Sequence, residues 1–149
     1  MKSEDDPIAD DEWLLRRVRV EKFRTDKLPV ISPNAFEPRT KGRDPDTDGI
    51  SLHRAACLAD LSEVLATIAS ERRHEYGIVR IAVSFLRSLD LSVVSKRDER
   101  VKGHVVIPQL NAGDYESDKA RFTALKVKLA TEASKDDNIL RRPKPADGE

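Results

Sequence analysis

Cysteine is nearly absent from this chain of 149 residues, which contains Cys57 alone. A single thiol forms no disulfide within the chain, and a cysteine-rich metal site is excluded. Because Cys57 follows two alanines and precedes a leucine, we expect it to be a small core residue. The alternative is a reactive pair with His53, which lies four residues earlier and shares a face with Cys57 if this stretch is helical.

Long apolar runs are also missing. No segment approaches the ~18 apolar residues that a membrane span requires. The first residues are acidic and lack the basic and apolar regions of a secretory signal. The sequence therefore predicts a cytoplasmic protein with no membrane partner.

An excess of charge of either sign is lacking, because 27 lysines and arginines balance 27 acidic residues. Nucleic-acid affinity usually rests on a basic surface that releases counterions, so we expect no nucleic-acid partner. The charges are nevertheless segregated, with residues 1–12 acidic and residues 16–24 basic. An acidic segment can fold back on a basic one, so overall neutrality leaves a local anion site open.

Nucleophile elbows, glycine-rich phosphate loops and zinc-binding patterns are all absent, so we predict no cofactor and no metal. The sequence Asp44-Pro-Asp46-Thr-Asp48-Gly copies the start of a calcium-binding EF-hand loop. Position 12 of such a loop must be a bidentate acid, and here it is Ala55. We therefore favour an acidic turn over a weak cation site at Asp44, Asp46 and Asp48.

The chain divides into three parts by composition. Residues 1–11 are predicted to be a disordered acidic arm, residues 12–133 a single domain, and residues 134–149 a polar tail. The fold class predicted for the domain is α+β, with a small mixed or antiparallel sheet and two main helices. A long proline- and glycine-rich loop, residues 23–49, follows the first strand.

Apolar periodicity places the elements within that domain. Alternation predicts a strand over residues 12–20, and β-branched residues predict strands at 78–83, 91–94 and 104–107. A short extended or helix-entry stretch is expected at residues 50–54. Asp60 and Glu63 form a capping box before an apolar stripe, which predicts a helix over residues 60–76. A short helix is expected from Ser84, and a last one from residue 117 or 118.

Arginines and histidines supply the candidate site residues. Arg16 and Arg17 are neighbours on a strand, so one guanidinium faces each side of the sheet. An arginine that points into a cleft suits phosphate or carboxylate, although pairing with local acids is the simpler interpretation. His53 and His104 are the candidate catalytic residues if the sheet brings their strands together. The candidate anion-binding residues are Arg16, Arg17, Ser51 and Arg54.

Four short blocks carry a resemblance: EWLLRRV from residue 12, SPNAF from residue 32, DGIS from residue 48 and GHVVI from residue 103. On these blocks the chain resembles short bacterial proteins with a leading double arginine and a late histidine-containing strand. No activity is established for such proteins, so the resemblance implies no catalytic residue. It does direct attention to the arginines and histidines named above, and to Ser32, Phe36 and Ser51.

Three functions compete at this stage. Small size, many charges and the missing catalytic motifs favour a non-enzymatic binding or accessory protein of the bacterial cytosol, with a protein partner, for example in a conflict or toxin–antitoxin system. The alternative is a small enzyme that acts on a phosphate-bearing or nucleotide substrate through strand arginines and histidines. A nucleic-acid accessory protein is the least favoured, because the net charge is zero.

Overall fold

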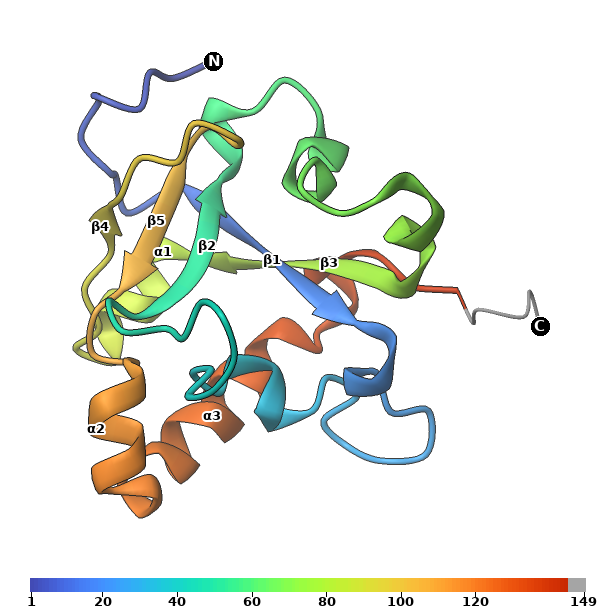
Figure 1. Cartoon of the computed structure of the whole chain (residues 1–149), viewed down its shortest axis with the longest axis vertical. Helices are drawn as coiled ribbons and strands as arrows, with labels where there is room; N and C mark the ends of the chain where they lie inside the picture. Colours follow the sequence, from blue (N-terminus) through green and yellow to red (C-terminus); the bar gives the residue numbers. More distant parts are fainter. Residues whose placement is uncertain (145–149) are drawn as a thin grey trace.

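A computed structural model describes residues 1–144 and places six strands in one antiparallel sheet of order β4-β5-β2-β1-β3-β6 (Figure 1). The predicted α+β class, with an antiparallel sheet, is confirmed. The central strands β1 and β3 pair along their whole length. The strands are β1 (Trp13–Arg19), β2 (Ile50–Arg54), β3 (Tyr76–Ala82), β4 (Val94–Ser95), β5 (His104–Ile107) and β6 (Ile139–Arg141).

The sheet buries side chains on both faces. One face forms the larger core, in which Leu14, Leu52 and Val105 pack under the helices. The other face forms a smaller cluster of Leu15, Val64, Leu65 and Ile78, as alternation along a strand requires. Each central strand therefore sends one set of side chains toward the helices and the other set toward the 3-10 turns of residues 61–75.

Three α-helices cover the larger core: α1 (Val83–Ser88), α2 (Ala112–Ser117) and α3 (Lys119–Ala133). The last helix is confirmed, and Asp118 caps it by accepting from the backbone N–H of Arg121. Helix α2 precedes it and begins after Asn111, whose side chain accepts from the Asp114 N–H. The described residues thus contain one long helix and two short ones.

The predicted helix over residues 60–76 is wrong in type. The capping box of Asp60 and Glu63 is present, but it opens a 3-10 turn (Leu61–Leu65), and a second such turn follows at Ser70–Glu75. Arg17 donates to the Val64 carbonyl and Arg73 to the Ile68 carbonyl. Since these carbonyls bond to side chains rather than to the N–H groups of an α-helix, tertiary contacts override the local helical pattern.

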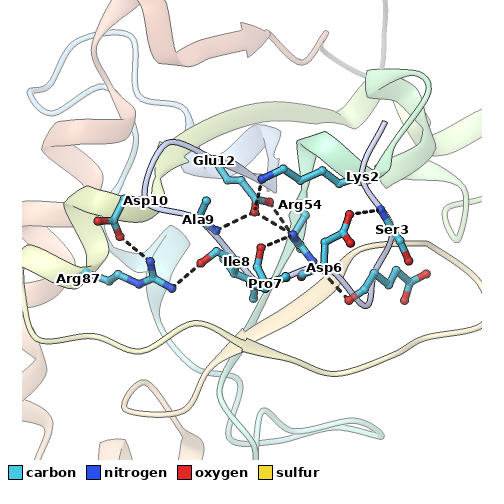
Figure 2. A network of polar contacts seen from close by, with 11 residues as sticks. Lys2, Ser3, Asp6, Pro7, Ile8, Ala9, Asp10, Glu12, Arg54 and Arg87 are labelled. Atoms are coloured by element: carbon cyan, nitrogen blue, oxygen red, sulfur yellow. Dashed lines mark hydrogen bonds and ion pairs between the residues drawn. The ribbon is translucent and has the colours of Figure 1, made fainter.

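Residues 2–12 pack on the body instead of forming the disordered arm that composition predicts. The buried carboxylate of Glu12 holds Arg54 through two hydrogen bonds of 2.8 Å (Figure 2). Arg54 also donates to the carbonyls of Asp6 and Pro7, which fixes the preceding residues. The predicted tail is also part of the fold, since β6 pairs with β3; residues 145–149 lie outside the described part.

The two halves of the sheet separate where β1 leaves β2, a place we call the strand fork. These strands pair only at Leu14 with Arg54 and at Leu15 with His53, and then diverge (Figure 1). Arg16 occupies the fork, donating from Nε to the Ala35 carbonyl at 2.8 Å and from Nη1 to the Ser51 carbonyl at 2.7 Å. Its guanidinium thereby satisfies a strand carbonyl that β1 no longer reaches.

Candidate functional site

A pocket of about 870 Å³ lies on the sheet face opposite the helices, and we call it the histidine pocket. Four of the predicted site residues line it: Arg17, Ser51, His53 and His104. Ser51 and His53 are two residues apart on β2 and share a face, while His53 pairs directly with His104 on β5. The expected convergence of the two histidines is therefore found, with their ring centroids 5.3 Å apart.

His104 and Ser51 form a directed hydrogen-bonded pair. The Nδ1 atom of His104 lies 2.5 Å from the Lys96 carbonyl oxygen, and its Nε2 lies 2.9 Å from Ser51 Oγ. A carbonyl oxygen only accepts, so Nδ1 carries a proton, and in this tautomer Nε2 is the atom that accepts from the Ser51 hydroxyl. This tautomer makes His104 a base aimed at a hydroxyl group.

His53 is a buried histidine without a hydrogen-bond partner. Only 6% of it is exposed, and no group within residues 1–144 bonds to either ring nitrogen. Burial lowers the pKa of His53 to about 3, and the neighbouring His104 and Arg17 add to that shift. The ring is therefore neutral at physiological pH, and it lines the pocket, where a ligand can form a hydrogen bond with it.

Arg17 is a cation of this wall that forms no ion pair within residues 1–144. Its Nη1 donates to the Val64 carbonyl and to the Thr67 hydroxyl, the latter at 2.7 Å, while Nε and Nη2 donate to no group of residues 1–144. Burial lowers the pKa of Arg17, yet the group stays charged at neutral pH. The N–H groups at Nε and Nη2 thus remain available to bind an anion.

The acidic loop, residues 44–49, lines the histidine pocket, and two of its carboxylates bind cations of the protein. Asp46 pairs with Arg39, and Asp48 with Lys96. These carboxylates neutralise exposed cations of the rim, and no cluster of metal-binding side chains is found in residues 1–144. Among the arginines that line the pocket, Arg17 and Arg43 form no ion pair within residues 1–144.

Two predicted anion-binding residues lie elsewhere. Arg16 faces the opposite side of the sheet from Arg17, as strand alternation predicts, and therefore does not join the histidines. Arg54 is fully buried and bound to Glu12, so its inclusion among the ligand-binding residues is wrong. It follows His53 on β2 and points to the other face. Cys57 is buried against Gly103, away from His53, so the reactive pair does not form.

Sequence reasoning missed two contributors to the pocket, the Lys96 carbonyl and the Thr67 hydroxyl. A backbone carbonyl leaves no signature in a sequence, and Thr67 lies in a segment predicted to be helical. The signal that did exist was the i, i+2 spacing of Ser51 and His53 on an extended stretch.

No protein-family model matches the chain, and neither a curated protein nor a solved structure matches it. The resemblance to short bacterial proteins therefore stays a prediction. Within residues 1–144, no helix is long and apolar enough to cross a membrane.

Proposed function

We propose that this chain is a small enzyme that acts on a phosphate ester in the histidine pocket. The observation that carries the proposal is the chain of hydrogen bonds from the Lys96 carbonyl through His104 to Ser51, beside the free N–H groups of Arg17. A base aimed at a hydroxyl group and a cation for an oxyanion are the two elements that ester transfer needs.

Each residue has a distinct task. Arg17 binds the nonbridging phosphate oxygens through Nε and Nη2. His53, neutral and unpartnered, donates its ring N–H to a further oxygen. As Ser51 Oγ bonds to phosphorus, its proton passes to His104 Nε2 and the ester bond breaks. The leaving group departs as an alkoxide, which takes a proton from water. Water then cleaves the phosphoserine and releases inorganic phosphate.

The test is phosphate release from a panel of phosphomonoesters by the full-length chain, with Ser51→Ala, His104→Gln and Arg17→Gln variants. We expect Ser51→Ala and His104→Gln each to lower kcat by at least about 100-fold, the range of general acid–base catalysis. Arg17→Gln should mainly raise KM. His74→Gln and Arg72→Gln, outside the pocket, serve as matched controls. Turnover that is equal in wild type and Ser51→Ala would refute the proposed nucleophile.

The non-enzymatic accessory function stays a prediction based on composition. It expects the protein to co-purify with a protein partner from its own host. A partner-free monomer in pull-downs across growth conditions would count against it.

A further inference from the structure

A second pocket, of about 640 Å³, lies on the helix side of the strand fork, and we call it the fork pocket. Arg16 lies at the fork itself, and the lysines Lys22, Lys41 and Lys119 also line the pocket. The fork pocket shares Arg17 and Arg39 with the histidine pocket. The two pockets therefore meet at the same pair of arginines.

Positive charge in the fork pocket exceeds the acidic charge available to balance it. Within residues 1–144, no carboxylate lies within 4.0 Å of the ammonium of Lys22, Lys41 or Lys119. Of the two acids in the wall, Glu37 already binds Lys126 and the Tyr115 hydroxyl. Only Glu116 is left to offset the lysines, so the wall attracts an anion.

Arg16 strengthens that attraction from the fork. Its described partners are two uncharged carbonyls, and no carboxylate of residues 1–144 forms an ion pair with it. Burial lowers the pKa of Arg16 to about 10, and the field of Asp46 only partly opposes this shift. Removing a guanidinium from water without an acidic partner is costly, and a bound anion would compensate for it.

The spread of these cations indicates a ligand with several charges in a row. The cations lie on separate elements: on β1, on the 38–41 loop and at the start of α3. Each of them can bind a different negatively charged group of one ligand, and a single phosphate does not supply several such groups. Single-stranded nucleic acid fits less well, because it also needs free aromatic faces for its bases. Tyr115 is the one aromatic in the wall, and its ring packs edge-on against Phe122 with the Lys126 ammonium 5.2 Å from its centroid.

We propose that the two pockets together bind a chain of phosphates. The terminal phosphate contacts Arg17 and His53, and the following phosphates contact Arg16, Lys41 and Lys119. This inference rests on the proposed function and deepens it, because it names the substrate class. Free inorganic polyphosphate and nucleoside polyphosphates share this chemistry.

The experiment is calorimetric titration of the full-length chain with orthophosphate, tripolyphosphate and ATP at one ionic strength. We expect tripolyphosphate to bind at least about tenfold more tightly than orthophosphate, a difference of about 1.4 kcal/mol. The double variant Lys41→Gln/Lys119→Gln should weaken tripolyphosphate binding about tenfold and leave orthophosphate binding unchanged. The matched control is Lys27→Gln/Lys128→Gln, whose lysines are exposed and outside both pockets.

The outcomes separate the two proposals. Equal affinity for orthophosphate and tripolyphosphate overturns the phosphate chain and leaves the phosphate-ester enzyme standing, whereas no binding of any of the three overturns both. Loss of both affinities to the same extent in the double variant indicates a general charge effect and overturns the chain. Displacement of tripolyphosphate by a single-stranded oligonucleotide at equal phosphate concentration also overturns the phosphate-chain proposal. If ATP binds more tightly than tripolyphosphate, the chain is supported and its source is a nucleotide.

Discussion

Arg54 and Arg17 belong to two regions of the molecule that differ in how fully the guanidinium is hydrogen-bonded to the protein. Arg54 is fully buried, and its hydrogen bonds are accepted by the Glu12 carboxylate and by the main-chain carbonyls of Glu4, Asp6 and Pro7 (Figure 2). Arg17 donates through Nη1 alone within residues 1–144, and it lines the histidine pocket. Both have lost much of their contact with water, but only Arg54 has regained its hydrogen bonds within the protein.

The difference separates a structural arginine from a ligand-binding one. A buried charge whose hydrogen bonds are complete gains nothing from a ligand, and its removal leaves its acidic partner buried and unpaired. A charge with incomplete bonds at a pocket wall does gain from an anion. Arg54 should therefore determine stability, and Arg17 should determine binding.

The largest effect is expected from Arg54→Met. It leaves the Glu12 carboxylate buried without its main partner, so the free energy of unfolding should fall by about 3–5 kcal/mol. Arg17→Met should lower it by no more than about 1.5 kcal/mol, the range of a single hydrogen bond. Urea denaturation measures both. The double variant Glu12→Met/Arg54→Met should recover part of the free energy of unfolding that Arg54→Met loses. Equal losses for Arg54→Met and Arg17→Met would contradict the distinction between a structural and a ligand-binding arginine.

The pH dependence of stability should differ between the two regions. Burial alone would raise the pKa of Glu12, but hydrogen bonds from Arg54, the Ala9 N–H and Lys2 lower it to about 2, against 4.5 unperturbed. The stability it contributes is full above pH 4.5 and is lost as pH falls toward 2. His53 acts at higher pH, because between pH 6.5 and 3 the unfolded chain protonates this ring and the folded chain does not.

His53→Gln should therefore flatten the decline in unfolding free energy between pH 6.5 and 4.5, a change of about 2 kcal/mol over that window. Glu12→Gln should flatten the decline only below pH 4.5. Thermal or urea unfolding at intervals of half a pH unit checks both windows, with His74→Gln as the control. An unchanged slope above pH 4.5 in His53→Gln would contradict a neutral buried ring.

The smallest effect on stability is expected from Ser51→Ala. It removes one hydroxyl hydrogen bond to His104, so the free energy of unfolding should change by no more than about 1 kcal/mol. The histidine signals in NMR should nonetheless shift, because His104 loses the donor to Nε2. A loss of several kcal/mol would instead assign Ser51 to the structural region beside Arg54.

Local pattern was a good guide to the strands and a poor one to the segment between residues 60 and 76. The β-branched residues of β3 and the short run of β5 have few alternatives to a buried strand, and both are found. In the predicted stripe, Val64 and Leu65 are buried and Leu61 is partly buried, yet they lie on a 3-10 turn. An apolar pattern predicts which side of a segment is buried. The backbone conformation of this segment depends on the hydrogen bonds that Arg17 and Arg73 donate to its carbonyls.

The candidate site was predictable in its residue types and only partly in its membership. Alternation along β1 correctly separates Arg16 from Arg17, whereas Arg54 was wrongly grouped with His53, its neighbour on β2, which faces the other side of the sheet. The sequence did not show that Arg54 meets Glu12, or that residues 2–12 are held in place by that contact. Composition indicated disorder for this segment because its own apolar content is low, while the bond that orders it lies on a distant strand.

The sequence by itself determined the strands β1, β3 and β5, the last helix and the alternation of faces along each strand, since these depend on spacing along the chain. Only the tertiary structure decided which faces meet. It brought His53 beside His104, set the Lys96 carbonyl against the His104 ring, and opened the fork that Arg16 occupies. Those arrangements depend on strand register and packing between segments far apart in sequence, and local periodicity carries no record of them.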